Sequence, residues 1–220
     1  MSTSTCSGRS RSRPQFERSC NRPWAFVPAI SSKAPWSSTV WTSASVTETY
    51  REKTIMATSV ISPDKDVIFA EIFVAAPPER VFEAISDPQQ LPKWWGQDGI
   101  YRSTKWEADM KPGGKWRCDC QSANRGEYHV GGEFLEIDPP RALVYTWIAS
   151  WSGPPATTVR WELKSVAGGT QVSIRHSGFQ ALPEAARAHA QGWSRVLAWM
   201  QAYVEKGETA DTRKALAPGA

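Results

Sequence analysis

The chain has 220 residues, which is enough for one large domain or two small ones. Its charge of +4 is unevenly placed, because residues 1–55 hold eight Lys/Arg and three Asp/Glu, whereas residues 56–220 hold eighteen and nineteen. The nearly neutral remainder argues against nucleic-acid binding, which requires basic residues clustered on the folded surface. No apolar run approaches the roughly 18 residues of a membrane span. Four cysteines, two of them before residue 55, favour a reducing, cytoplasmic setting over a disulfide framework.

Residues 1–55 are rich in Ser, Thr and Arg and show no sustained hydrophobic period. Met56 precedes the first clean strand pattern, so we expect translation to begin there and residues 1–55 to be a mis-annotated extension. A targeting peptide or a disordered tail is the alternative, since transit peptides share this composition. The folded domain is therefore expected over residues 56–210, with a flexible tail at 211–220.

The first predicted strand covers residues 67–74, where β-branched and aromatic residues dominate. Pro77 and Pro78 then open a short helix, because the N–H that proline lacks has no partner in a first helical turn. Asp87-Pro88 is typical of an N-cap followed by a first helical residue. This pattern predicts a second short helix that ends at Trp94-Trp95-Gly96.

A run of strands is predicted next, over residues 103–110, 115–120, 126–138, 142–149, 157–164 and 170–176. Pro112-Gly113-Gly114 provides a tight turn between the first two of these strands. Gly131-Gly132 is expected to form a bulge that bends the longest strand. Gly153-Pro154-Pro155 separates two later strands. On the first strand of this run, Trp106, Ala108 and Met110 are expected to share one face.

One long helix closes the chain, starting at Pro183-Glu184 and ending at Gly207. One face of this helix carries Trp193, Val196, Leu197, Met200 and Val204. Such a stripe is typical of a helix packed against a sheet. The order of strand, two short helices, about six antiparallel strands and a long helix indicates an α+β protein.

Four segments of the chain resemble a known family: VAAPPERVFEAISDPQQLPKWWG, ADMKPGGKWRC, GEFLEIDPPRALVYTW and RHSGF…GWSRVLAWM. In this order they are similar to the SRPBCC superfamily (START, birch-pollen-allergen and polyketide-cyclase proteins). The closer similarity is to homologues of the heat-shock protein 90 ATPase activator's C-terminal domain. The resemblance spans residues 67–206 and implies a helix-grip fold, in which a bent antiparallel sheet of about six to seven strands and the long C-terminal helix enclose a cavity.

The resemblance implies several functions, because the superfamily includes lipid and hormone carriers, cyclases, hydroxylase domains and co-chaperones of the stress response. Function on a shared fold has to be argued from the site. Strand parity and the helix stripe predict a ligand cavity lined by Trp95, Trp116, Cys118, Cys120, Tyr145, Trp147, Trp161, Ile174, His176, Trp193 and Leu197. Alternatively, these large side chains fill the core, and Val144, Thr146 and Ile148 form the inner face of their strand.

Cys118-x-Cys120 and His176 could supply three zinc ligands, but no fourth candidate follows from the sequence, and reduced cysteines are ordinary core residues. We therefore expect no metal and no cofactor. The family motif places a histidine where His176 stands, and an inward histidine is either a hydrogen-bonded core residue or an acid–base catalyst. Catalysis would need a partner such as Tyr145 or Glu133.

The sequence thus favours a cytoplasmic protein that binds a small hydrophobic or aromatic ligand and performs no evident catalysis. A cyclase- or dehydratase-like enzyme that uses His176 is one alternative. A chaperone-binding, ATPase-activator-like module is the other, although residues 1–55 are too short and unpatterned to replace the activator's N-terminal domain. No nucleic-acid partner and no membrane span are expected, and homodimerisation stays open.

Overall fold

The structure, a computed structural model, describes residues 56–122, 124–150 and 155–214. Within these residues, nine strands form one antiparallel sheet in the order β1-β2-β9-β8-β7-β6-β5-β4-β3. The strands are β1 (Thr58–Ile61), β2 (Val67–Val74), β3 (Gly96–Gln97), β4 (Tyr101–Ala108), β5 (Lys115–Ser122), β6 (Gly126–Asp138), β7 (Ala142–Ala149), β8 (Thr157–Val166) and β9 (Gly169–Ser177). The α+β helix-grip class is confirmed, whereas the expected number of six to seven strands is too small.

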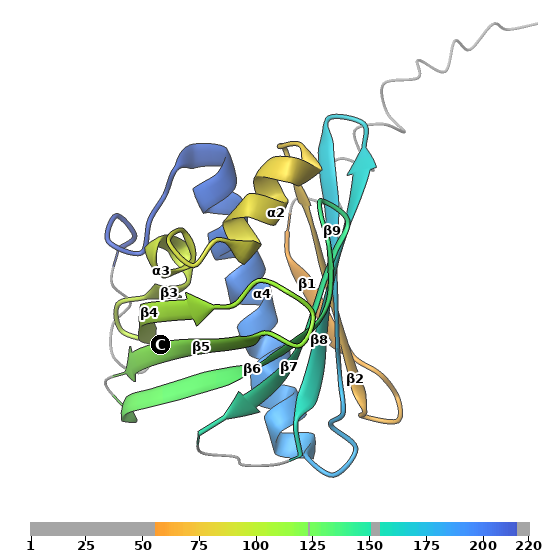
Figure 1. The fold of residues 1–220 in the computed structure, drawn as a ribbon, viewed down its shortest axis with the longest axis vertical. Helices are drawn as coiled ribbons and strands as arrows, with labels where there is room; N and C mark the ends of the chain where they lie inside the picture. Colours follow the sequence, from red (N-terminus) through yellow and green to blue (C-terminus); the bar gives the residue numbers. More distant parts are fainter. Residues whose placement is uncertain (1–55, 123, 151–154, 215–220) are drawn as a thin grey trace, which may run out of the picture. The chain divides into compact units, whose positions relative to one another are not determined.

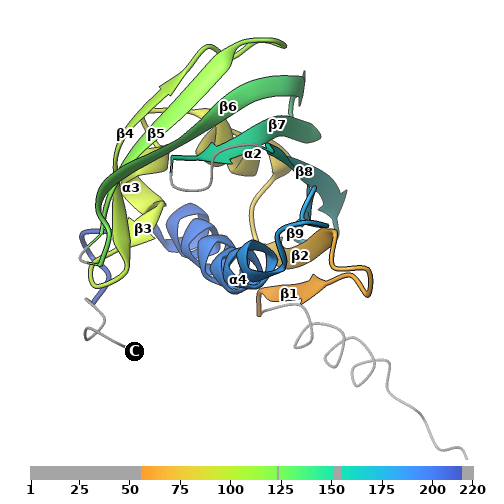
Figure 2. The same cartoon turned by 90° about the horizontal axis from the view of Figure 1, so that it is seen from below.

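Three helices accompany the sheet in the described part of the chain: α2 (Pro78–Ser86), α3 (Leu91–Trp94) and α4 (Pro183–Lys206). α2 and α4 both begin at a proline, as predicted. α4 ends at Lys206, and Gly207 caps it with a left-handed φ of 69°, which favours glycine. Figure 1 shows α2 and α3 near one end of α4, and Figure 2 shows the sheet curving around α4.

α4 packs against β1 and β2, at one edge of the sheet. Its buried face includes Trp193, Val196, Leu197 and Met200, which were predicted to form the apolar stripe. From β2 the sheet bends through β9, β8 and β7, so that β4 to β6 lie across from α4 in Figure 2. One half of the sheet, around β1 and β2, therefore packs directly against α4, whereas the half formed by β4 to β6 faces it from across the bend.

Two strands and one helix start differ from the sequence prediction. β1 pairs with β2, but its residues are only exposed or half-buried, so no apolar period marks it. β3 has two residues, which is too short for any period. The second helix begins at Leu91, because Asp87 caps a turn instead: its carboxylate accepts the backbone N–H of Gln89 at 2.8 Å.

The prediction of a bulge at Gly131-Gly132 is wrong, because the register shift between β6 and β7 lies between Phe134 and Glu136. Instead, Gly131 and Gly132 allow the backbones of the neighbouring strands to approach β6 closely. A Cβ on Gly132 would lie 1.9 Å from the carbonyl oxygen of Thr146, which no side chain could occupy. A further shift, which the sequence did not indicate, interrupts the pairing of β4 with β5.

The inner face of β7 carries Tyr145 and Trp147, not the alternative set with Ile148. Tyr145 and Trp147 point to the helix side, whereas Ile148 is 41% exposed. On β4, Trp106 packs inward, but Met110 lies beyond the strand and is exposed, so its predicted place on the inner face is wrong.

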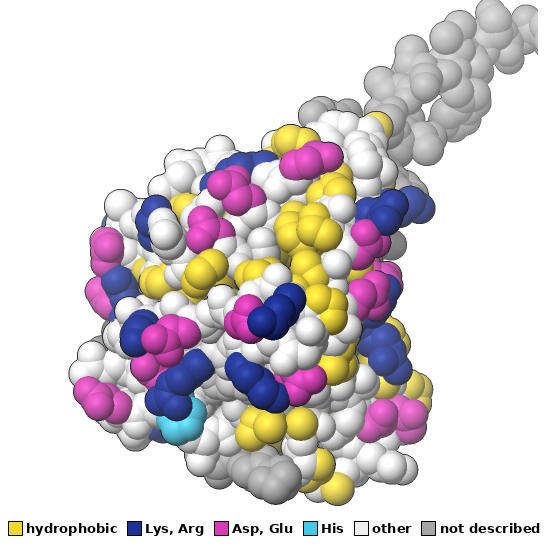
Figure 3. All heavy atoms as spheres, in the orientation of Figure 1, with side chains coloured by type: hydrophobic (Ala, Val, Ile, Leu, Met, Phe, Trp, Pro, Cys, Tyr) yellow, Lys and Arg dark blue, Asp and Glu magenta, His cyan; other side chains and the backbone are white. Residues whose placement is uncertain are grey.

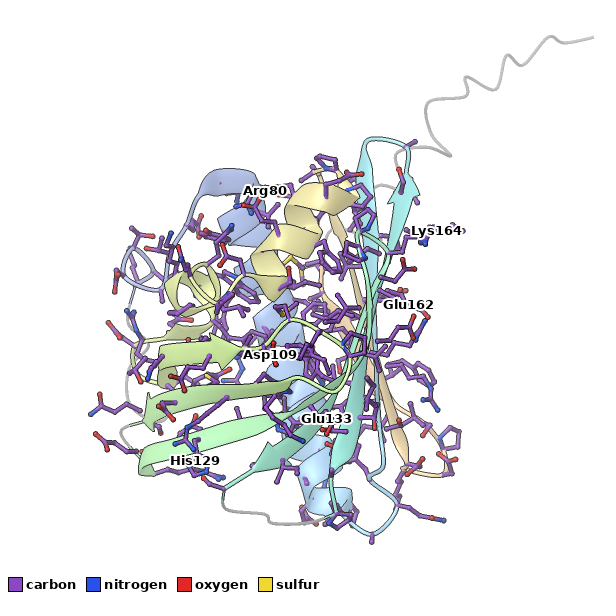
Figure 4. All side chains as sticks on the ribbon, viewed as in Figure 1. Arg80, Asp109, His129, Glu133, Glu162 and Lys164 are labelled. Carbon is purple, nitrogen blue, oxygen red and sulfur yellow. The ribbon has the colours of Figure 1, made fainter. Side chains whose placement is uncertain are left out.

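The outer face of the sheet is charged and exposed to solvent. The guanidinium of Arg160 donates to the carboxylates of Glu136 at 2.6 Å and Glu162 at 2.7 Å. Figure 3 shows acidic and basic side chains on both sides of a band of apolar side chains, and Figure 4 shows Glu162 and Lys164 pointing away from the sheet. Exposed ion pairs of this kind contribute little to stability and need no partner to explain them.

The segment after α4 returns across α3 and β3. The backbone N–H of Ala210 donates to the Lys93 carbonyl at 2.7 Å. The Arg213 guanidinium donates to the carbonyl oxygens of Trp94 at 3.0 Å and Gly96 at 2.6 Å. The part of the expected flexible tail that is described, residues 211–214, is therefore hydrogen-bonded to the domain.

Three expectations concern residues outside the described part of the chain: the extension at 1–55, the Gly153-Pro154 turn and the last residues, 215–220. Among the helices that are described, none combines the length and the apolar composition that a membrane span requires.

Candidate functional site: a tryptophan-walled cavity

A cavity of about 330 Å³ lies between α4 and the β4–β6 side of the sheet. Its volume falls at the lower end of the range of small-molecule sites. Its walls are formed by Trp95, Ile100, Tyr101, Trp106, Cys118, Cys120, Ser122, Asn124, Arg125, Tyr128, Val130, Trp147, Ala188, His189, Gly192, Trp193, Arg195 and Val196. Because these residues come from one helix, four strands and three connecting segments, the cavity depends on the whole bend of the sheet.

Exposure along the wall locates the mouth of the cavity. Asn124 and Arg125, in the turn between β5 and β6, are exposed, and so are Ala188 and Arg195 on α4. The tryptophans and cysteines of the wall are buried or half-buried. The cavity therefore opens between the β5–β6 turn and the middle of α4.

Gly192 helps to keep this space open. It lies within α4 and lines the cavity, and a Cβ built on it would meet no atom within 4 Å. A glycine in a helix interior costs about 1 kcal/mol relative to alanine. No close backbone contact at Gly192 requires a glycine, so its effect is to leave volume beside the tryptophans.

Four tryptophans surround the inner end of the cavity. The rings of Trp95 and Trp106 lie 5.3 Å apart, and those of Trp95 and Trp147 are stacked at 6.4 Å. Trp193 meets Trp95 edge-on at 6.2 Å. Aromatic rings bury large areas and favour offset or edge-on contacts with another flat ring. The wall therefore suits a planar, conjugated molecule.

Two of these tryptophans carry hydrogen-bond donors that have no acceptor. The Trp95 indole N–H donates to the Tyr101 hydroxyl at 2.9 Å, and the Trp193 indole N–H donates to His176 at 3.0 Å. By contrast, the buried Nε1 atoms of Trp106 and Trp147 have no partner among the described residues. Unpaired buried donors are rare, and each calls for an explanation. An acceptor on a bound molecule would satisfy these two.

Cys118 and Cys120 lie side by side on the cavity wall, with their Sγ atoms 3.4 Å apart and not joined in a disulfide. A hydrogen bond from Cys118 lowers the pKa of the Cys120 thiol, and a second one from Tyr128 acts in the same direction. Burial raises the pKa of Cys118 and of Tyr128. Of the two thiols, Cys120 therefore has the surroundings more favourable to a thiolate.

A zinc ion bound by Cys118 and Cys120 would find no third ligand among the described residues. In the described part of the chain, no group of three or more His, Cys, Asp or Glu side chains could hold a metal ion. His176, the ligand considered from sequence, does not line the cavity and uses both ring nitrogens in hydrogen bonds. Two thiols alone do not make the four-coordinate site that zinc prefers.

His176 is completely buried, and its hydrogen bonds fix its protonation state. An indole N–H can only donate, so the Trp193 bond makes Nδ1 of His176 the acceptor. The proton therefore sits on Nε2 and is donated to the Thr157 hydroxyl at 2.7 Å. Thr157 donates in turn to the Trp147 carbonyl at 3.3 Å. Burial lowers the pKa of His176 well below 6.5, and the nearby His189 acts in the same direction.

His189, on α4, reaches the cavity that His176 does not. Its Nδ1–H donates to the Ala185 carbonyl at 2.8 Å, which leaves Nε2 as the acceptor of the neutral ring. Burial lowers the pKa of His189, and the bond to the Ala185 carbonyl opposes this in part. The neutral ring thus offers one acceptor at the cavity wall.

The charged side chains of the described cavity wall are all positive. Arg125 and Arg195 stand at the mouth, and no Asp or Glu belongs to the wall. Arg195 makes no ion pair with any described residue. A cleft lined by cations attracts anions, so the mouth suits a ligand with an acidic group.

The eleven residues predicted for the cavity fall into two groups in the structure. Trp95, Cys118, Cys120, Trp147 and Trp193 line the cavity. The others are buried in the adjoining core: Trp116, Tyr145, Trp161, Ile174, His176 and Leu197. In this core the Trp161 indole N–H donates to the Tyr145 hydroxyl at 2.9 Å, so both polar atoms are satisfied away from the cavity.

The residues that sequence reasoning missed lie mainly at the mouth: Ser122, Asn124, Arg125, Ala188, His189, Gly192 and Arg195. Most of them resemble ordinary turn or solvent-facing helix residues, so no local signal distinguishes them. Gly192 carried a signal, because a glycine in the middle of a long helical pattern usually has a packing or functional reason. Trp106 and Tyr128 also line the cavity, and Trp106 shared the predicted inner parity of its strand.

The sequence profile of the family described as Activator of Hsp90 ATPase homolog 1-like protein matches residues 75–205, more than half of the chain. The chain belongs to this family. The matched region runs from the start of α2 almost to the end of α4 and includes every described element that forms the cavity. The SRPBCC resemblance seen in the sequence is thereby confirmed, down to the activator-type branch.

Solved structures agree with this fold. Protein CV1439 from Chromobacterium violaceum is 27% identical, with a TM-score of 0.56 over 64% of this chain and 98% of its own. Ms6760 from Mycobacterium smegmatis is 20% identical, with a TM-score of 0.58 over 67% and 96%. DynU16, from the dynemicin biosynthetic locus, is 23% identical, with a TM-score of 0.55 over 66% and 49%. A comparison with curated proteins gave no match.

Proposed function

We propose that this protein binds a small, flat, largely aromatic molecule with an acidic group, in the cavity between α4 and the β4–β6 side of the sheet. The observation that carries the proposal is the pairing of an aromatic interior with a cationic mouth. Stacked tryptophans offer ring faces, while Arg195 and Arg125 stand where the charged end of such a ligand would lie. The acceptors of a carboxylate also match a wall that is rich in donors.

An acid–base role for His176 fits the geometry poorly. Its ring is outside the cavity, and each nitrogen already has a partner within 3.0 Å. Protonation would place a second N–H opposite the Trp193 indole N–H, which also donates. A proton-transfer catalyst needs a nitrogen within reach of the substrate, so His176 is better explained as a structural residue of the core.

Activation of a chaperone's ATPase is a second candidate, because the family is described by that activity. It would need a surface for the chaperone rather than an occupied cavity. Stimulation of ATP hydrolysis by the full chain, with purified heat-shock protein 90, would support it. Loss of that stimulation on closing the cavity would link the two functions.

Two ligands of nearly equal size test the proposal: naphthoate, which is an anion, and naphthylmethanol, which is neutral. Both are titrated by calorimetry into the full-length protein. We expect naphthoate to bind about three- to tenfold more tightly, because exposed charge pairs contribute modestly, and we expect added salt to shrink this difference. Equal affinity at low salt would remove the acidic group from the proposal, and no binding of either would overturn the proposal itself.

Gly192→Phe shows whether the binding site is this cavity. A phenyl ring at residue 192 would occupy the space beside the tryptophans without displacing any atom near its Cβ. We expect at least a tenfold loss of affinity for both ligands. Ala198→Phe, on an exposed position of the same helix, is the matched control and should bind as the parent does. Unchanged binding by Gly192→Phe would place the site elsewhere.

A further inference from the structure

The two thiols of the cavity wall are potential nucleophiles, and the binding of a ligand alone makes no use of this reactivity. Cys118 and Cys120 both face the cavity, although β5 could have carried any apolar residue at these positions. Their Sγ atoms are 3.4 Å apart, a hydrogen-bonding distance for sulfur. Neither takes part in a disulfide. Both thiols therefore stand where they could react with a molecule held between the tryptophans.

Cys120 has the more favourable surroundings. Tyr128 faces it across the β5–β6 pairing, and the tyrosine hydroxyl forms a hydrogen bond with the Cys120 thiol. Cys118 is the second neighbour on the same side. The hydrogen bond with the Tyr128 hydroxyl and the thiol of Cys118 at 3.4 Å favour a thiolate at Cys120, which is the nucleophilic form. Cys118 is more deeply buried, which raises its pKa, and its thiol lies within hydrogen-bonding distance of both the Asp119 carbonyl and the Cys120 sulfur.

The cavity supplies the other half of a reactive site. A conjugated carbonyl compound with an aryl ring would meet the ring faces of the wall, and its oxygen becomes negatively charged when a nucleophile adds. Trp106 pairs directly with Cys118 across β4 and β5, and its indole N–H is one of the two unpaired donors. A site that combines a thiolate with unpaired donors is suited to conjugate addition.

We propose, on the basis of the function proposed above, that Cys120 captures aryl α,β-unsaturated carbonyl compounds covalently within the cavity. The Cys120 sulfur forms a bond to the β-carbon, and the electron pair of the C=C double bond moves to the enolate. The proton that left the thiol returns to the α-carbon. The sum is the addition of S–H across one double bond, which needs no oxidant, reductant or leaving group.

Other uses of the two cysteines fit the structure less well. A disulfide would join neighbours on one face of one strand, where the sulfur and Cβ geometry of a relaxed disulfide is not attained. A metal ion would lack further ligands, because no third His, Cys, Asp or Glu side chain of the described residues completes a group with the two thiols. Neither alternative would use the Tyr128 hydroxyl.

The test uses phenyl vinyl ketone and the full-length protein, which contains its own reference thiols, Cys6 and Cys20. After brief exposure, the adducts are fixed with borohydride and located by peptide mass spectrometry. We expect Cys120 to be labelled at least tenfold faster than Cys6 or Cys20 at neutral pH. Labelling of Cys120 at or below the rate of these two residues would overturn the proposal, and so would preferential labelling of Cys118.

Variants separate the nucleophile from the residue that positions its charge. Cys120→Ser should abolish labelling on β5, and Tyr128→Phe should slow labelling of Cys120 about three- to tenfold while Cys6 keeps its rate. Because Tyr128 acts through the thiolate, the pH profile of Cys120 labelling should also move to higher pH in Tyr128→Phe. An unchanged profile would contradict the role of Tyr128. Melting temperatures of both variants show whether the fold is intact.

The two proposals fail in different ways. Gly192→Phe should slow the labelling of Cys120, which lines the cavity, while the labelling rates of Cys6 and Cys20 serve as the reference. If naphthoate binds to the unmodified protein but Cys120 reacts no faster than the reference thiols, only the covalent step is wrong. If Cys120 reacts just as fast in Gly192→Phe, the reaction does not take place in the cavity and the covalent proposal is overturned.

Discussion

The two halves of the sheet meet α4 in opposite ways. On the side of β8 and β9, the polar groups that face the helix are paired. His176 forms hydrogen bonds with Trp193 and Thr157, and Trp161 forms one with Tyr145. On the side of β4 to β6, the wall contains unpaired indole donors, free thiols and a glycine in the facing helix. One half is a closed core, and the other half encloses the cavity.

The difference shows how one fold separates stability from function. Satisfied buried groups and close packing give the closed half a single arrangement. The open half keeps volume and unsatisfied donors, both of which cost stability unless a ligand compensates for them. Residues of the same type therefore have different roles, and tryptophans show this most directly.

The largest effect is expected from removing a tryptophan from each half. Trp161 is 1% exposed and fills the closed core, so Trp161→Ala should lower the free energy of unfolding by about 3–5 kcal/mol. Trp106 is only half-buried beside an existing cavity, and Trp106→Ala should cost about 1–2 kcal/mol, in proportion to its smaller buried area. Urea unfolding measures both. Equal losses would mean that the two halves do not differ in packing.

A smaller loss is expected at the hydrogen bonds of His176. Thr157→Val keeps the shape of the side chain but leaves the His176 Nε2–H without its acceptor, in a position that is completely buried. An orphaned buried donor costs about 1–3 kcal/mol. The matched control is Thr158→Val, next on β8 and on the opposite face, for which a change within about 0.5 kcal/mol is expected. If both variants are equally stable, the hydrogen-bond chain is unimportant.

The closed half could be predicted from sequence to a large extent, because its signals are local. β-Branched and aromatic composition predicted β2, alternation of apolar residues predicted β5, and the apolar stripe of α4 matches the buried face of the helix. β1 was not predicted because it is partly exposed and half of its residues are Ser or Thr. β3 was not predicted because it has two residues. Short edge strands depend on pairing with neighbours, which no period reveals.

The open half could be predicted only in part. Parity placed Cys118, Cys120 and Trp147 on the inner side, but whether they face a void or a packed core depends on how far the sheet bends. That bend depends on irregular pairing, such as the shift between Phe134 and Glu136. Arg195 looked like any solvated helix residue, since its neighbour in space, the β5–β6 turn, lies about seventy positions away along the chain.

Acid should weaken the closed half through His176. Its folded-state pKa lies below the unfolded value near 6.5, so the unfolded chain binds the proton more tightly and stability is lost as pH falls below about 6.5. The free energy of unfolding should drop by up to about 1.4 kcal/mol per pH unit, and His189, whose pKa is lowered too, adds to the slope. His176→Gln should show a shallower slope between about pH 6.5 and 5, measured by urea unfolding. A slope as steep as that of the parent would assign the acid sensitivity to other groups.

The smallest predicted change acts on the open half and has the opposite sign. Gly192→Ala replaces a poor helix former where a Cβ meets no atom within 4 Å, so the free energy of unfolding should rise by about 1 kcal/mol. The added methyl group takes some of the cavity, and affinity for naphthoate should fall about two- to threefold. Thermal melting and calorimetry on the same sample measure the two effects together. A gain in stability with unchanged affinity would show that the open volume at Gly192 is not used for binding, whereas a loss of stability would mean that this turn of α4 needs glycine for its backbone. The expected combination, greater stability with weaker binding, would show that stability is lowered at this position to keep the cavity open.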